Sequence, residues 1–241
     1  PNLGGILLFS TVGLVVTAII QSSAATFAIV LIMCSKGWIT FELACALVLG
    51  SNIGTTITPI LASMSGNVAA KRTAMGHLLF NLLGTIWCLC VFIPFAQFNV
   101  WLTEAIGQGN PNELYTFVNT LHSEQPDLYN QLFSNSLPAG HEVLTKIASM
   151  QMSVSFGMSL FHTTFNLVNV CIMIWLTGLY VKIVEWVVPA KRRDDEEFTL
   201  KFISRGLVGA AELNIAQAEK EISVYSERVS RMIDMAQELI H

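Results

Sequence analysis

Two short polar stretches carry the side chains that could bind an ion, and each interrupts apolar sequence. The first stretch reads Gln21, Ser22, Ser23, Ala24, Ala25 and Thr26. Its serines stand where a helix would begin, so they can cap free backbone N–H groups, and the same helix end can receive an oxyanion. The Gln21 amide adds a donor and an acceptor. We interpret this stretch as an anion site, with an ordinary capped hairpin turn as the alternative.

The second stretch, residues 50–58, concentrates neutral oxygen atoms and contains no carboxylate. Hard cations favour oxygen ligands, and the lack of a carboxylate disfavours a tight calcium or magnesium site. The pattern therefore predicts sodium and no other metal. The candidate sodium ligands are Ser51, Asn52, Thr55 and Thr56. The alternative is a kink at Gly50 and Gly54 that lets two helices pack closely.

The sequence around both stretches indicates a membrane protein. Of its 241 residues, 53% are hydrophobic and 12% are charged, with a mean hydropathy of +0.57, whereas soluble domains carry about 25% charged residues. Interrupted backbone at membrane depth survives only where it is buried in protein or lines a wet cavity. Secondary transporters build their sites from such discontinuous helices, so the two interruptions favour a transporter.

We predict an all-α integral membrane protein with five parts. These are a re-entrant helical hairpin over 3–34, a broken transmembrane helix over 39–65, two further spans at 73–95 and 151–189, a polar loop over 96–150, and a helical tail over 190–241. Basic residues at span ends favour the cytoplasm. Lys191, Arg192 and Arg193 therefore predict a cytoplasmic C-terminus and an extracytoplasmic loop, in a multi-pass protein of the plasma (inner) membrane.

One short pattern, H-x-x-F-N, occurs twice inside apolar sequence. It places His77 beside Asn81, and His162 beside Asn166. Residues four apart share one face of a helix. We interpret both pairs as intramembrane polar support that joins helices by hydrogen bonds, with a direct role beside a substrate path as the alternative.

The two stretches together resemble the sodium/phosphate cotransporter family, of the type II kind and its bacterial relatives, over about residues 5–95. The resemblance implies sodium-driven uptake of inorganic phosphate by alternating access. It also implies that residues 21–26 contact phosphate and that Ser51, Asn52, Thr55 and Thr56 serve sodium or phosphate. The family usually has three serines after the glutamine, and here the third position is Ala24.

The resemblance also implies an architecture. Family members have two inverted repeats, each with such a hairpin, and this chain contains one hairpin, so it resembles the second half of a transporter. The first repeat or a second copy would complete the site. Bacterial members often carry a PhoU-like helical domain after the last span, and residues 190–241 resemble the start of one.

Other classes of function remain as alternatives. A symporter for another oxyanion or a dicarboxylate could use the same hairpins, and a membrane-tethered regulator of phosphate uptake would use the tail. We expect no enzyme, because the sequence shows no paired carboxylates, no Ser/His/Asp set and no phosphate-cradling loop. We expect sodium as coupling ion and no cofactor. The expected partners are phosphate, sodium and the lipid bilayer, and not nucleic acid.

Overall fold

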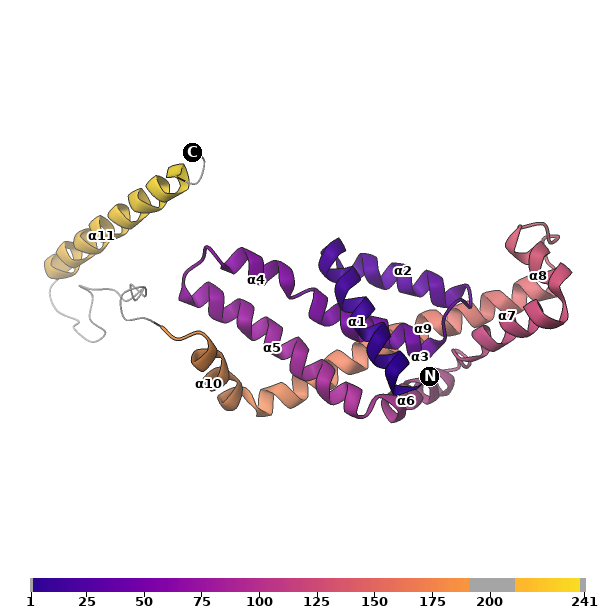
Figure 1. Cartoon of the computed structure of the whole chain (residues 1–241). Helices are drawn as coiled ribbons and strands as arrows, with labels where there is room; N and C mark the ends of the chain where they lie inside the picture. The colour runs from indigo at the N-terminus through magenta and orange to yellow at the C-terminus, as the bar shows by residue number, and fades with distance from the viewer. Residues whose placement is uncertain (1, 191–210, 239–241) are drawn as a thin grey trace. The chain divides into compact units, whose positions relative to one another are not determined.

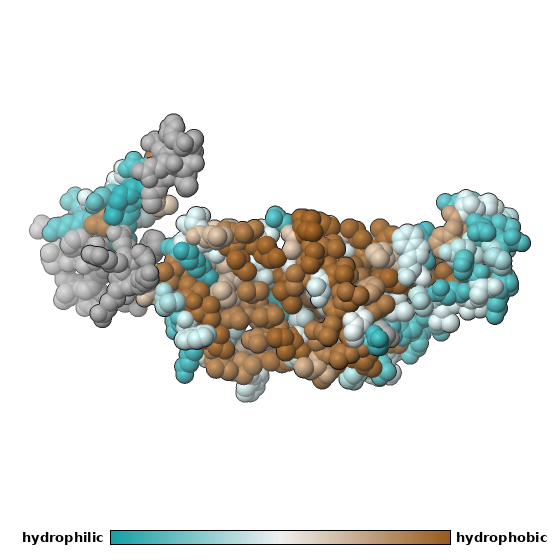
Figure 2. All heavy atoms as spheres, in the orientation of Figure 1, coloured by the Kyte–Doolittle hydropathy of each residue, from teal (hydrophilic) through white to brown (hydrophobic). Residues whose placement is uncertain are grey.

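The computed structural model describes residues 2–190 and 211–238, and within these ranges every regular element is an α-helix (Figure 1). The chain forms two compact units, residues 1–191 and 192–241. Four helical segments are long and apolar enough to cross a membrane: Leu3–Ile20, Phe41–Ser63, Val68–Cys90 and Glu142–Trp175. Figure 2 shows apolar residues gathered over the middle of the first unit. The prediction of an all-α, multi-pass membrane protein is confirmed.

The first predicted interruption separates helices α1, Leu3–Ile20, and α2, Ser23–Ser35. Gln21 ends α1 in the left-handed conformation, with φ of 56°, which non-glycine residues rarely adopt. Its N–H donates to the Thr17 carbonyl oxygen over 2.7 Å. Ser22 caps α2, because its Oγ accepts from the Ala25 N–H over 3.2 Å. A helix–break–helix hairpin is present, and its re-entrant course through a membrane stays a prediction.

The second predicted interruption separates α3, Phe41–Gly54, from α4, Ile57–Ser63. Pro59 explains its position, because proline has no N–H to donate to the carbonyl of Thr55 four residues earlier. The Thr55 hydroxyl donates to the Ser51 carbonyl over 3.1 Å, and the Thr56 hydroxyl to the Ile53 carbonyl over 2.7 Å. The hydroxyls thus satisfy carbonyls that the interruption frees.

Helices α1 and α3 run in the same direction and pack backbone against backbone. A Cβ atom on Gly50 or Gly54 would overlap carbonyl oxygens of α1, and one on Gly13 would overlap a carbonyl oxygen of α3. Only glycine permits this approach, and Gly50 and Gly54 are spaced as in the small-residue motif that joins membrane helices. In the most apolar 18 residues of Phe41–Ser63, 61% of the residues are buried, against 22% of the residues of α1, so α3 lies at the centre of the unit (Figure 1).

Residues 96–150 differ from the expected loop, because most of them are helical. They include the end of α6, Phe92–Ala105, all of α7, Glu113–Glu124, and α8, Pro126–Phe133, and the start of α9, Glu142–Trp175. Leu114, Val118 and Leu121 of α7 recur at helical spacing and are buried. Most residues between these three are polar, so the short amphipathic pattern is difficult to recognise in the sequence.

The two later spans also have different bounds from those expected. Helix α5, Val68–Cys90, begins before 73, because the Asn67 side chain caps it, and it contains Lys71 and Arg72. It ends at Cys90, whose carbonyl cannot receive an N–H from Pro94. The segment 151–189 is divided between α9 and α10, Thr177–Val187.

Helix α10 is attached to α5 by polar contacts. Arg72 Nε donates to the Val188 carbonyl oxygen over 3.1 Å, and Arg72 Nη1 lies 3.5 Å from Glu185 Oε1. The Tyr180 hydroxyl donates to the Gly76 carbonyl oxygen. The last helix of the first unit therefore holds a fixed position against α5.

The second unit contains α11, Ala211–Glu238. Its exposed apolar side chains include Ile222, Tyr225, Val229 and Met232. The basic residues 191–193 lie outside the described residues. The likeness of 190–241 to the start of a PhoU-like domain stays a prediction.

Candidate functional site

The two polar stretches meet through a residue that the sequence analysis did not select. Thr17 Oγ1 of α1 lies 3.0 Å from Thr26 Oγ1 of α2 and 2.9 Å from Ser51 Oγ of α3. The three residues are 0%, 1% and 4% exposed, respectively. Interruptions that are far apart in the chain thus share one buried cluster of hydroxyl groups.

The beginning of α2 offers hydrogen-bond donors. The Ser22 carbonyl oxygen accepts from both the N–H and the Oγ1 of Thr26, each over 3.1 Å. The N–H groups of Ser23 and Ala24 occupy the first two positions of the helix, which have no intrahelical acceptor. Ser22 and Ser23 are half-buried, whereas Gln21 and Ala24 are exposed. This accessible end carries the positive pole of the helix dipole and can receive an anion.

The end of α3 offers oxygen atoms and one unpaired amide. Ser51 and Thr56 are buried, and Asn52 and Thr55 are half-buried. Thr55 and Thr56 donate their hydroxyl protons to carbonyls of α3, so their oxygens keep lone pairs for a cation. Asn52 Nδ2 is buried without a hydrogen-bond partner. Buried polar groups are normally paired, so this atom marks a position for a ligand or water.

In both H-x-x-F-N pairs the asparagine amide donates within its own helix, and the predicted role of these pairs as polar support between helices stays a prediction. Asn81 Nδ2 donates to the His77 carbonyl oxygen over 3.0 Å within α5, and Asn166 Nδ2 donates to the His162 carbonyl oxygen over 2.8 Å within α9. Each amide therefore satisfies its own helix.

Two other asparagines make polar contacts between helices. Asn169 of α9 is fully buried, accepts from Trp87 Nε1 over 3.1 Å and donates to the Phe80 carbonyl oxygen over 3.2 Å. Asn99 of α6, also fully buried, accepts from Thr164 Oγ1 over 2.6 Å. Both lie in apolar sequence without a repeated pattern, so only the packing of the helices reveals their partners.

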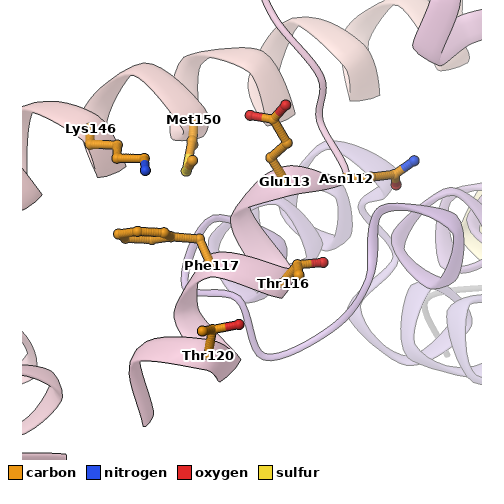
Figure 3. Close-up of a pocket in the computed structure, with 7 residues that line it drawn as sticks. All are labelled: Asn112, Glu113, Thr116, Phe117, Thr120, Lys146 and Met150. Carbon is orange, nitrogen blue, oxygen red and sulfur yellow. The ribbon is translucent and has the colours of Figure 1, made fainter. Parts of the chain in front are cut away.

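An open groove of about 480 Å³ lies between α7 and α9 (Figure 3), and no residue of the hydroxyl cluster lines it. It is lined by Asn112, Glu113, Thr116, Phe117, Thr120, Lys146 and Met150. Lys146 Nζ stands 4.6 Å from the centre of the Phe117 ring. The groove includes none of the predicted site residues. In the described ranges, no group of three or more His, Cys, Asp or Glu side chains could hold a metal ion.

Membrane-length apolar helices with two interruptions that meet at a shared polar cluster are the arrangement that secondary transporters use, with discontinuous helices around their sites. Residues 7–97 match the family model described as Na+/Pi-cotransporter, so this segment of the chain is similar to that family. The matched segment contains both interruptions. The predicted resemblance to this family is thereby confirmed over the matched segment.

Several relatives extend this comparison. The uncharacterized protein YqeW of Bacillus subtilis is 34% identical over 75% of this chain and 43% of its own length. The putative inorganic phosphate export protein YjbB of Salmonella typhimurium is 22% identical over 99% of this chain and 35% of its own. The human sodium-dependent phosphate transport protein 2B is 37% identical over 40% of this chain and 14% of its own. The chain thus spans less than half the length of these relatives. No solved structure matches it.

Proposed function

We propose that the protein is a sodium-coupled phosphate symporter, which moves inorganic phosphate into the cell by alternating access without a cofactor. The observation that carries this proposal is the contact of Thr17 with both Thr26 and Ser51, which unites the two interruptions. In this proposal residues 21–26 bind phosphate at the start of α2, and Ser51, Asn52, Thr55 and Thr56 bind sodium at the end of α3.

Charge explains why sodium and phosphate would bind together. Residues 1–70 contain one basic residue, Lys36, and its Nζ stands 5.8 Å from the centre of the Phe133 ring on α8. Phosphate in a weakly polar site would therefore meet helix N–H groups and hydroxyls but no fixed cation from this segment. A sodium ion beside it would supply the missing positive charge, so that binding of each ion favours binding of the other.

Phosphate uptake by the full-length protein in proteoliposomes tests this proposal. We expect radiolabelled phosphate to accumulate with an inward sodium gradient and not with potassium or choline. Equal uptake in all three would remove sodium coupling. Stronger competition by sulfate or a dicarboxylate than by phosphate would indicate a different substrate. Phosphate release from preloaded vesicles under an outward sodium gradient, measured beside uptake under an inward gradient, compares export with import. Export is the activity in the name of the YjbB relative.

We also propose a topology, with the C-terminus cytoplasmic, the α7–α8 segment extracytoplasmic, and this chain as one half of an inverted-repeat transporter in the plasma membrane. The exposed residues Gln131 and Ala190 stand in these two regions. In a background without the exposed Cys90 and Cys171, an impermeant maleimide should label Gln131→Cys in intact cells and Ala190→Cys only after permeabilisation. The reverse labelling pattern would invert the topology.

A further inference from the structure

The hydroxyl cluster has a definite direction, because each hydroxyl carries only one proton. Thr26 Oγ1 donates its proton to the Ser22 carbonyl oxygen. Thr26 Oγ1 can therefore only accept from Thr17 Oγ1, and Ser51 Oγ also accepts from Thr17 Oγ1, over 2.9 Å. The one proton of Thr17 thus has one acceptor on each side of the cluster, Thr26 on α2 and Ser51 on α3.

This arrangement decides what the serine of each interruption can offer. Ser51 Oγ accepts from Thr17, so its hydroxyl is held in one orientation and its remaining lone pair can face a cation. Ser22 Oγ accepts from the Ala25 N–H, so its own proton is available to an anion. The Thr17 hydroxyl stands between these two serines.

The packing of α1 on α3 fixes Thr17 in this place. A Cβ atom on Gly54 would come within 2.7 Å of the Thr17 Cβ atom and within 2.5 Å of the Leu14 carbonyl oxygen. The second glycine of the small-residue motif is therefore the reason that Thr17 can reach Ser51. Thr17 itself is fully buried, so it would act through its neighbours and not on an ion directly.

We propose that Thr17 is a positioning residue, which donates to Ser51 and so holds the Ser51 oxygen where its lone pair can bind sodium, and which ties the cation side of the site to the anion side. This inference rests on the proposed function. Without the Thr17 hydroxyl, the Ser51 hydroxyl would turn freely, and its oxygen would no longer be preorganised for a cation. Removal of the Thr17 hydroxyl should therefore lower sodium affinity more than phosphate affinity.

The test compares Thr17→Val, which keeps the shape, with Thr17→Ser, which keeps the hydroxyl, in sodium-driven phosphate uptake by the full-length protein. Loss of one buried hydrogen bond should raise the sodium concentration for half-maximal uptake roughly three- to ten-fold in Thr17→Val. In Thr17→Ser, the sodium concentration for half-maximal uptake should stay within about two-fold of the wild type. In Thr17→Val at saturating sodium, the phosphate concentration for half-maximal uptake should also stay within about two-fold of the wild type. Thr103→Val is the matched control, because Thr103 is fully buried and donates only to the Asn99 carbonyl of its own helix.

Two outcomes would overturn the inference: an unchanged sodium midpoint in Thr17→Val, or equal impairment of Thr17→Val and Thr17→Ser. If Thr17→Val does not fold, Thr17→Ala provides the same comparison, because it lacks the hydroxyl and adds no bulk. Absence of sodium dependence in the wild type would instead refute the proposed function. A wild type that depends on sodium, beside an unshifted Thr17→Val, would refute the positioning role alone.

Discussion

Gly50→Ala is expected to prevent the normal assembly of the first unit. The added Cβ atom would overlap the carbonyl oxygen of Ser10, and this oxygen belongs to the backbone of α1, so no side-chain rotation can relieve the clash. Overpacking usually costs about 1–3 kcal/mol, and we expect the upper end or more because two helix axes must separate. Thermal unfolding in detergent, followed with size-exclusion profiles, should show a large loss of stability and of monodisperse protein.

Gly178→Ala is the matched control for this prediction. Gly178 is a helical glycine of α10, and a Cβ atom there would meet nothing within 4 Å. This substitution should be neutral or slightly stabilising, because alanine favours helix by up to about 1 kcal/mol. A Gly50→Ala protein with the thermal stability of the wild type would show that α1 and α3 are not packed as described.

Asn52→Ala should lower sodium-driven phosphate uptake and leave the stability of the fold nearly unchanged. Asn52 Nδ2 is buried and has no hydrogen-bond partner in the fold, so its removal sacrifices no bond made by that amide group. The free energy of unfolding should change by less than about 1 kcal/mol. Sodium-driven phosphate uptake should fall at least roughly ten-fold if the amide serves an ion, since loss of a hydrogen bond to a charged group costs about 1.5–3 kcal/mol.

The comparison for this variant is Asn119→Ala. The Asn119 amide is exposed on α7 and donates to the Tyr115 carbonyl oxygen of its own helix over 2.7 Å. It should retain both stability and uptake. Wild-type uptake kinetics in Asn52→Ala would remove Asn52 from the site, and a large loss of thermal stability would mean that the amide has a structural role.

Hydropathy and local chemistry were sufficient to predict both interruptions. Gln21 and the two serines stand out within an apolar run, and Pro59 stands one turn after the threonines that mark the second interruption. These are local signals, since lost backbone hydrogen bonds must be replaced close to where the helix stops. The elements that position the site were therefore predictable, although their bounds shifted by several residues.

Contacts between helices were not predictable in the same way. In the sequence, Thr17 is one more residue of an apolar helix, and its contact with Ser51 depends on the parallel packing of α1 on α3. Asn81 and Asn166 had the right spacing for a shared face, yet each bonds its own helix. A side chain's partner depends on how far each helix is rotated about its axis, and the pattern of one sequence does not specify this rotation. Residues 50–58 illustrate this, because the sequence fits two interpretations, close helix packing and sodium binding. The structure shows the close packing at Gly50 and Gly54, and sodium binding by the neighbouring residues is proposed.

Phosphate binding to the purified full-length protein, titrated at fixed sodium or potassium concentration, tests the central claim most directly. If one pocket holds both ions, phosphate affinity should rise with sodium and not with potassium, and Asn52→Ala should weaken the rise. Phosphate affinity that is the same in both salts, for the wild type and the variant alike, would mean that the two interruptions do not form one coupled site.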